Sequence, residues 1–478
     1  MSSANINSLT IKDALAGLKS KKFSSVELVT ACFEQIEKVD PKVHAFLLLS
    51  KEPALVDAKH ADNLIAKEGA NAFNIQPLLG IPYACKDNFN TKGITTTASA
   101  NIIKNYIPPY ESTVTKKLKT AGAILLGKTN MDAFAHGSST ATSDFFTTLN
   151  PWDLNRVAGG SSGGSAVAVI TNMCIFAIGS ETSGSIRGPA AWCGISGLKP
   201  TYGRVSRYGV IAMASSTDSP GPMCKTFEDC AQVLSVIAGN DPNDATTSPK
   251  ALDDYFGSLT NFSLKGKKIG KPKSYFSNAV DSGVVNVINN CLKEFEKMGA
   301  EIVDIDLLDP KYSIAVYTIL QRSEVSSNLA RFDGIRFGND RSSFGFEAKK
   351  RMMLGAYVLS AGYYDQYYAK AQKVRTLIVE DFNMAFTKVD FIAGPTMPCV
   401  ALRTDEDLNG AMFGEMMDVL ASPSSIAGLT GASIPCGFSE GMPVGMQLIG
   451  PMFAEANILG ASYNYQQVSS FHKEQVKI

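Results

Sequence analysis

Residues 159–169 read GGSSGGSAVAV, a glycine- and serine-rich loop that runs directly into an apolar stretch. A second loop of this kind, residues 179–189, reads GSETSGSIRGP and follows the apolar run 174–178. Glycine permits positive φ and close backbone approach, and helix N-termini favour anions, including a developing oxyanion. Two such loops, each entering a helix, therefore predict free backbone N–H groups that point at one spot.

Short apolar runs bounded by glycine and proline recur on both sides of these loops and alternate with helix-like stretches. Such runs are typical of buried strands. The expected strands are residues 80–85, 123–127, 174–179, 268–271, 302–305, 391–393, 433–436 and 444–449. The pattern predicts an α/β fold in which a mixed β-sheet core is sandwiched by helices.

The 478 residues show no linker, so we expect a single domain over 1–478. Ser24-Ser25-Val26-Glu27 is a capping box before apolar positions at helical spacing, and we expect Pro41 to close that helix. The expected divisions are an N-terminal helical layer (about 8–70), a Gly/Ser-rich catalytic core (about 76–225), an inserted helical subdomain (about 312–386) and a return to the core (about 388–470).

Composition narrows the class of protein. Lys plus Arg and Asp plus Glu both total 45, so the chain has no global electrostatic reason to hold nucleic acid. Nine scattered cysteines without a C-x-x-C pair argue against a disulfide framework or a zinc site, and no metal site is expected. The start of the chain lacks a signal-peptide pattern, and the longest apolar stretch, 166–179, is too short for a bilayer. We therefore expect a cytoplasmic protein.

Three other kinds of site have partial sequence support. Residues 159–163 match G-x-S-x-G, but the preceding 150–158 reads as a polar loop, and His472 is the only later histidine. A phosphate-binding loop would need a Gly-Lys-Ser/Thr sequence, which neither segment contains. Cys85 could be a nucleophile, although a small buried hydrophobe is the commoner role for such a residue.

With only four histidines in the chain, a lysine becomes an attractive base. Residues 80–88 read GIPYACKDN, which predicts a strand that ends in Lys86. A serine hydroxyl needs an adjacent base, and burial lowers the pKa of a lysine until its neutral form can serve. The alternative is that Lys86 simply forms an ion pair with Asp87 or another carboxylate.

Together, the lysine strand and the two loops resemble the amidase signature family, with Ser161 following Lys86 by 75 positions and Ser185 following Ser161 by 24. The resemblance implies that Ser185 is the nucleophile. It also implies that Ser161, in a cis peptide, connects Ser185 to Lys86, which accepts the proton and later returns it to the leaving amine. The implied oxyanion hole consists of the backbone N–H groups of Thr182, Ser183, Gly184 and Ser185.

The likeness extends from about residue 8 to residue 455. The segments 350–355 (KRMMLG), 360–365 (SAGYYD), 370–375 (KAQKVR) and 418–428 are similar to the branch that serves tRNA-dependent amidotransferases. In that branch the amide donor is glutamine, and the likeness implies that Arg351 binds its α-carboxylate and Asp418 its α-ammonium. Ser138 is a further candidate substrate contact. The alternatives are a surface helix arginine for Arg351 and a helix or loop cap for Asp418.

The same resemblance implies partners. A B subunit would bind ATP, Mg²⁺ and the tRNA, a small C subunit would clamp the two, and this chain would need no cofactor. Four positions depart from the usual pattern, where Asp, Gly, Gln and Met are common: Glu181, Ser183, Gly188 and His136. Two rival functions are a free-standing amidase acting on aryl, acyl or peptide amides and an inactive scaffold that binds partners.

Overall fold

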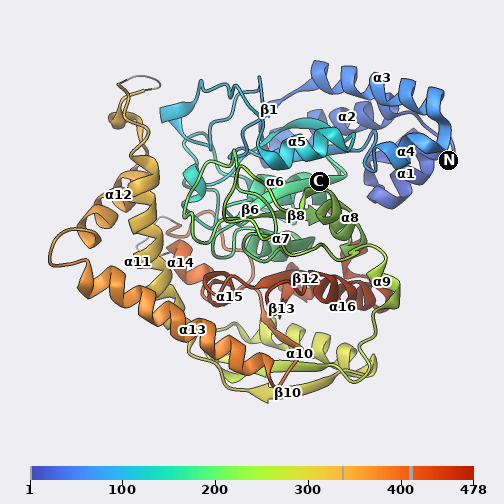
Figure 1. Cartoon of the computed structure of the whole chain (residues 1–478). Helices are drawn as coiled ribbons and strands as arrows, with labels where there is room; N and C mark the ends of the chain where they lie inside the picture. The colour runs from blue at the N-terminus through green and yellow to red at the C-terminus, as the bar shows by residue number, and fades with distance from the viewer. Residues whose placement is uncertain (1–2, 336–338, 409–412) are drawn as a thin grey trace.

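A computed structural model describes residues 3–335, 339–408 and 413–478, and a large mixed sheet forms its centre (Figure 1). Within these residues the sheet has eleven strands in the order β1-β3-β2-β6-β8-β7-β12-β13-β11-β9-β10. The strands are β1 (Phe46–Leu49), β2 (Pro82–Lys86), β3 (Ile124–Thr129), β6 (Phe176–Glu181), β7 (Ser196–Lys199), β8 (Ser219–Cys224), β9 (Lys268–Pro272), β10 (Glu301–Ile305), β11 (Phe391–Pro395), β12 (Thr430–Ser439) and β13 (Met442–Gly450).

Parallel and antiparallel pairs alternate in blocks along the sheet. Strand β2 is parallel to β3 and β6, while β6 is antiparallel to β8, and β12 is antiparallel to β7 and β13. All eight apolar runs expected to be strands correspond to strands of this sheet. The predicted mixed α/β core is therefore confirmed.

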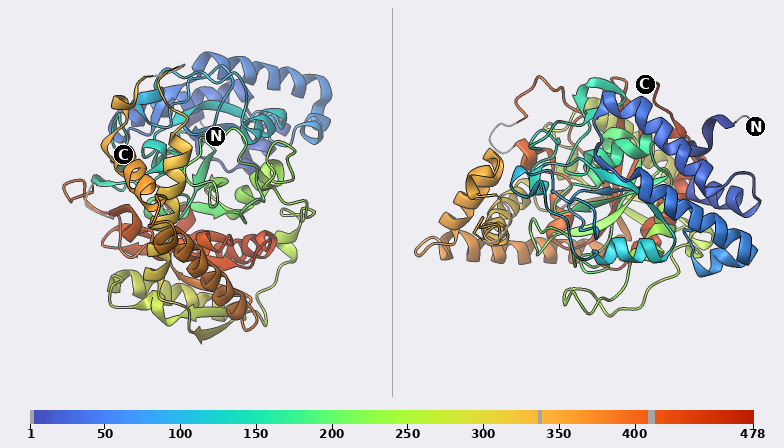
Figure 2. Two further views of the ribbon diagram at one scale, coloured as in Figure 1. Left: turned by 60° about the vertical axis from the view of Figure 1, so that its left-hand side comes forward. Right: turned by 90° about the horizontal axis from the view of Figure 1, so that it is seen from above.

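Helices cover the sheet, as the views in Figures 1 and 2 show. They are α1 (Ile11–Lys19), α2 (Ser25–Val43), α3 (Lys51–Glu68), α4 (Ala72–Ile75), α5 (Thr113–Thr120), α6 (Gly163–Ile170), α7 (Arg187–Cys193), α8 (Phe227–Ile237), α9 (Ser258–Asn261), α10 (Ser282–Lys297), α11 (Pro310–Leu329), α12 (Phe346–Val358), α13 (Lys370–Phe386), α14 (Phe413–Met417), α15 (Ser422–Ile426) and α16 (Glu455–Val468). Every residue of α6 and α7 is buried, so the two glycine- and serine-rich loops lead into the interior.

Helix α2 begins as expected and ends later than expected. The Ser24 hydroxyl accepts from the N–H of Glu27, and the Glu27 carboxylate accepts from the N–H of Ser24, which completes the capping box. The prediction that Pro41 closes the helix is wrong, because α2 continues to Val43. Pro41 lies in the last turn, where only two more helical residues follow before His44 adopts a left-handed cap.

The segment 150–158, expected to be a polar loop, forms a short hairpin instead. Strands β4 (Leu149–Asn150) and β5 (Asp153–Val157) make a separate two-stranded sheet. The hairpin is held to the segment that follows β11, since Thr404 donates its backbone N–H to Asn155 O and Arg156 donates to Ala401 O. The strand before residue 159 therefore lies outside the central sheet.

Residues 310–335 and 339–386 project to one side of the sheet and are mainly helical (Figure 1). Helix α11 packs against α12, α13 and α15, and α15 leads into β12. Tyr317 on α11 reaches the loop after β6, where its hydroxyl lies 3.3 Å from Thr182 Oγ1. This helical segment thus contributes side chains to the centre of the molecule. No helix in the described ranges is both long and apolar enough to cross a membrane.

Candidate active site

Lys86 ends β2 and is fully buried. Its Nζ donates to Ser161 Oγ at 2.7 Å and to the carbonyl oxygen of Ser180 at 3.0 Å. Burial lowers the pKa of Lys86 to about 7, and more distant carboxylates offset this only in part. Asp87 faces Lys128 at 3.6 Å, so it is not the partner of Lys86. Lys86 therefore has the burial and the hydroxyl contact that a lysine base needs.

Ser161 lies in the loop that precedes α6, and the Gly160–Ser161 peptide bond is cis. A Cβ on Gly160 would collide with Asp132 Oδ2, so this loop needs glycine there. The N–H of Ser162 donates to the carbonyl oxygen of Ser185 at 3.2 Å. This bond ties the first glycine-rich loop to the second and brings Ser161 and Ser185 into one site.

The backbone N–H groups of residues 182–185 donate to no acceptor within the described part of the chain. Glu181 fixes the next two N–H groups, because its Oε2 accepts from Ile186 and Arg187 at 3.0 Å each. Four consecutive free N–H groups beside a serine are an arrangement that can stabilise a negatively charged oxygen. Ser185 lies at the end of this row, in the turn that leads into α7.

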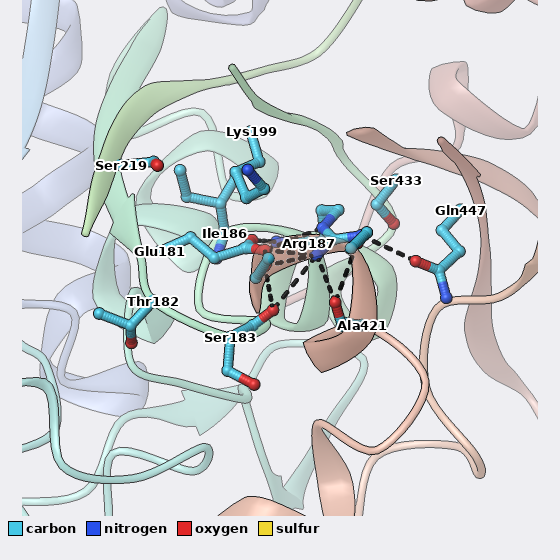
Figure 3. A network of polar contacts seen from close by, with 12 residues as sticks. Glu181, Thr182, Ser183, Ile186, Arg187, Lys199, Ser219, Ala421, Ser433 and Gln447 are labelled. Carbon is cyan, nitrogen blue, oxygen red and sulfur yellow. Dashed lines mark hydrogen bonds and ion pairs between the residues drawn. The ribbon is translucent and has the colours of Figure 1, made fainter. Parts of the chain in front are cut away.

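Arg187 holds the loop in place through a buried network of hydrogen bonds (Figure 3). Its guanidinium donates to Glu181 Oε1 at 2.6 and 2.9 Å and to Gln447 Oε1 at 2.7 Å. It also donates to the carbonyl oxygens of Ser183 and Ala421. Arg187 lowers the pKa of Glu181 against the opposing effect of burial. Glu181 stands where Asp is usual, and both of its carboxylate oxygens accept hydrogen bonds that hold the loop.

Asp418 is buried against the loop after β6. A Cβ on Gly184 would collide with Asp418 Oδ1, which itself has no partner among the described residues. Burial and, after it, Glu181 raise the pKa of Asp418 well above its usual range, and the nearby Ser138 hydroxyl opposes the rise. Because Asp418 Oδ1 accepts no hydrogen bond from the described residues, this oxygen does not cap a helix or a loop. Asp418 presents a free carboxyl oxygen next to Gly184.

Arg351 is only 3% exposed, which excludes the surface helix arginine. Its Nε donates to Glu347 Oε1 at 2.7 Å, and its NH2 lies 3.4 Å from Glu415 Oε1. Arg351 and Asp418 both influence the pKa of Tyr317, the first lowering it and the second raising it, although burial is the largest effect. Helices α11 and α12 and the segment around α14 thus bring these groups to one region.

Ser138 joins the same region. Its Oγ donates to the carbonyl oxygen of Gly414 at 3.0 Å, so it connects the loop after β3 to α14. The remaining departures also lie in the interior: Ser183 Oγ is buried and without a partner among described residues, and a Cβ on Gly188 would meet Met397 Sδ at 3.0 Å.

Sequence reasoning missed three side chains near Arg351 or Asp418, namely Arg322, Glu415 and Tyr317, and a buried glutamine on the helix of two of them. Arg322 on α11 pairs with Glu415 Oε1 at 2.9 Å, and Tyr317 and Gln321 lie on the same helix. These residues come from segments without a recognisable motif, so only the fold brings them to the site.

The other candidate sites find no support in the geometry. Burial raises the pKa of the Cys85 thiol to about 12, which leaves it protonated. His472, whose pKa burial lowers to about 4, lies in the C-terminal turn Phe471–Lys473. Among the described residues, no group of three or more His, Cys, Asp and Glu side chains could hold a metal ion.

Comparison with known proteins fits this geometry. The amidase family model matches residues 27–459. The A subunit of the glutamyl-tRNA(Gln) amidotransferase of Carboxydothermus hydrogenoformans is 47% identical, over 98% of this chain and 99% of its own length. Its counterpart in Lactiplantibacillus plantarum is 46% identical, over 97% of each chain. The chain therefore belongs to the amidase family.

Solved structures agree with this assignment. The crystal structure of the A subunit of the Thermotoga maritima glutamyl-tRNA(Gln) amidotransferase has a TM-score of 0.83, with 36% identity over 99% of this chain and 98% of that one. The native peptide amidase of Stenotrophomonas maltophilia has a TM-score of 0.81, with 28% identity and 96% coverage of each chain. The fold is thus shared by family members that are named for different activities.

Proposed function

We propose that this chain is the glutaminase subunit of a tRNA-dependent amidotransferase, which hydrolyses glutamine with a Ser185–Ser161–Lys86 triad. The observation that carries the proposal is the contact of 2.7 Å between buried Lys86 Nζ and Ser161 Oγ, next to the four free N–H groups of residues 182–185. The named amidotransferase relatives, which match almost the full chain, support the choice of reaction.

In this mechanism, Ser185 Oγ attacks the carbonyl carbon of the glutamine side-chain amide. Its proton passes to Ser161, whose own proton passes to neutral Lys86, while the carbonyl electron pair moves onto oxygen. The N–H groups of residues 182–185 stabilise that oxyanion. As the tetrahedral intermediate collapses, the C–N bond breaks, Lys86 returns the proton through Ser161 to nitrogen, and ammonia leaves. Water then attacks the glutamyl ester on Ser185 and passes a proton through Ser161 to Lys86. Lys86 returns this proton through Ser161 to Ser185 Oγ as the ester bond breaks and glutamate leaves.

Substrate selection would depend on Arg351 and Asp418. Asp418, with its free Oδ1 beside Gly184, would receive the α-ammonium of glutamine, and Arg351 would receive the α-carboxylate. Glu347 and Glu415 already contact Arg351, so the α-carboxylate would share the guanidinium with them. Ser138, which connects α14 to the loop after β3, would support this pocket.

The ammonia would pass to a B subunit that binds ATP, Mg²⁺ and the tRNA, and a small C subunit would hold the two together. The B subunit would use ATP to activate misacylated Glu-tRNA(Gln), with Asp-tRNA(Asn) as a second acceptor to be tested. The balanced charge of this chain, 45 basic and 45 acidic residues, fits a protein that leaves most tRNA binding to a partner.

The test is the release of glutamate from glutamine by the chain purified from its own host with whatever co-purifies. Ser185→Ala should abolish release, whereas Ser462→Ala, a buried serine on α16, should retain it. Full activity of Ser185→Ala would contradict the nucleophile assignment. Turnover of aryl or acyl amides by the lone chain, without turnover of glutamine, would instead indicate a free-standing amidase.

A further inference from the structure

Two neutral side chains near the candidate substrate pocket are buried without a hydrogen-bond partner. His136 and Gln321 are each 1% exposed. Both ring nitrogens of His136 and both amide atoms of Gln321 lack a partner among the described residues. A buried polar group without a partner costs free energy, so such groups need an explanation, and a bound ligand is one. The proposed triad uses neither side chain.

His136 lies in the loop after β3 and faces positive charge. Its ring packs against Phe134, with 6.0 Å between the ring centroids, and its own carbonyl oxygen accepts from Thr142 Oγ1. Burial and then Arg351 and Arg322 lower the pKa of His136 well below its usual range, so the ring is neutral. A neutral imidazole has one N–H donor, and two nearby guanidiniums favour an anion as the group that receives it.

Gln321 lies one helical turn after Tyr317 on α11, and residues four apart share a helix face. The Tyr317 hydroxyl is 3.3 Å from Thr182 Oγ1, beside the predicted oxyanion hole. The next residue along the chain, Arg322, pairs with Glu415. Gln321 therefore lies on the same face of α11 as Tyr317 and is the sequence neighbour of Arg322.

We propose that His136 and Gln321 determine specificity for the amino-acid end of the amide donor, with His136 and Arg351 together binding its α-carboxylate. Gln321 offers an amide N–H and an amide oxygen to the same amino-acid end, from the side of Tyr317. This inference rests on the proposed glutaminase function and adds a recognition role that Arg351 and Asp418 alone do not supply.

The test compares glutamine with 4-aminobutanamide, which keeps the amine and the side-chain amide and lacks the α-carboxylate. The preference is the ratio of kcat/KM for the two amides. His136→Phe and Gln321→Leu should each lower this preference about tenfold to a hundredfold, the range for losing a hydrogen bond to a charged group. His136→Asn, which restores a donor, should recover part of it. Tyr255→Phe, which removes the hydroxyl of a different buried side chain without a partner, should keep the full preference.

Equal losses on both substrates would overturn the proposal and assign the two side chains to folding alone. If either variant unfolds, the affinity of Ser185→Ala for glutamine, measured by calorimetry with and without His136→Met, decides instead, because methionine is common at this position and has no N–H donor. Unchanged affinity would then contradict the role of His136. Hydrolysis of aryl amides but not of glutamine by the unmodified chain would refute the glutaminase proposal itself. That result differs from the two outcomes above, which concern only the roles of the two side chains.

Discussion

Lys86 can be a base only because its surroundings exclude water. In water a lysine is protonated at neutral pH, but the buried position at the end of β2 lowers its pKa to about 7. Two hydrogen bonds, to Ser161 Oγ and to the Ser180 carbonyl oxygen, hold the amine without placing a carboxylate against it. A directly paired carboxylate would favour the charged form and remove the base.

This environment gives a prediction for the pH dependence of the reaction. Above pH about 7 Lys86 is mainly neutral, and below it the amine is protonated and cannot accept the proton from Ser161. The kcat/KM for glutamine should therefore rise with pH through about 7 in a steady-state assay. Lys86→Ala should reduce the rate by about a hundredfold or more, the usual worth of a general base.

Lys225 is a suitable control, since it is buried, its pKa is lowered to about 8, and it contacts the carbonyl oxygens of Asn7 and Leu9. Lys225→Met should leave the midpoint of the pH profile in place. A loss of less than about tenfold in Lys86→Ala would mean that this lysine is structural.

Asp418 gives a second prediction at this scale. Its raised pKa keeps the carboxyl protonated to higher pH than usual, while binding an ammonium needs the carboxylate. The KM for glutamine should therefore fall as pH rises through the titration of Asp418. Asp418→Asn should raise the KM for glutamine about tenfold or more and have little effect on glutaramate, which lacks the α-amino group. An equal effect on both substrates would contradict ammonium binding.

At the level of elements, a buried ion pair holds the loop between β6 and α7 in place. Glu181 and Arg187 are both fully buried and connect this loop to α15 and β13. Arg187→Leu leaves the Glu181 charge buried and unpaired, which typically costs about 3–5 kcal/mol of stability. Denaturant unfolding should show a loss of that order.

A double-mutant cycle with Glu181→Gln and Arg187→Leu checks this directly. The combined loss should be clearly smaller than the sum of the single losses, because both changes remove one shared interaction. Additive losses would show that the two side chains stabilise the loop separately.

The strands that the sequence predicts well are short apolar runs between glycine and proline. Three strands of the sheet were not predicted. Strand β1 reads FLLL and lies inside the segment 8–70 that was expected to be a helical layer. Strands β7 and β8 read SGLK and SPGPMC, with no β-branched or aromatic side chain. Proline usually argues against an interior strand, yet Pro220 and Pro222 lie in β8 between β6 and β7. Tertiary packing, not local propensity, determines these elements.

At the scale of the whole molecule, the site residues that lie in motif-bearing segments could be predicted from the sequence. The site residues that single helix positions contribute could not. Lys86, Ser161 and Ser185 stand in recognisable segments, and the fold places these segments on adjacent β2, β6 and α6. Glu415 and Arg322 belong to ordinary helical sequence. Their proximity to Arg351 depends on the way α11, α12 and α14 pack, which no local pattern encodes.

The cysteines provide a prediction for the molecule as a whole. All nine are free, and eight are buried, as small apolar side chains often are. Thermal unfolding should therefore give the same Tm with and without a reducing agent. A Tm that falls on reduction would reveal a disulfide and contradict this arrangement.

The most direct test of the central claim is intact-mass and peptide mass spectrometry of the chain quenched during turnover of glutamine. The account predicts a glutamyl group on Ser185 in the unmodified chain. It also predicts that Lys86→Ala slows the formation of this ester and that Ser185→Ala has none. A glutamyl group on Cys85 or on another residue, or continued hydrolysis by Ser185→Ala, would contradict the triad.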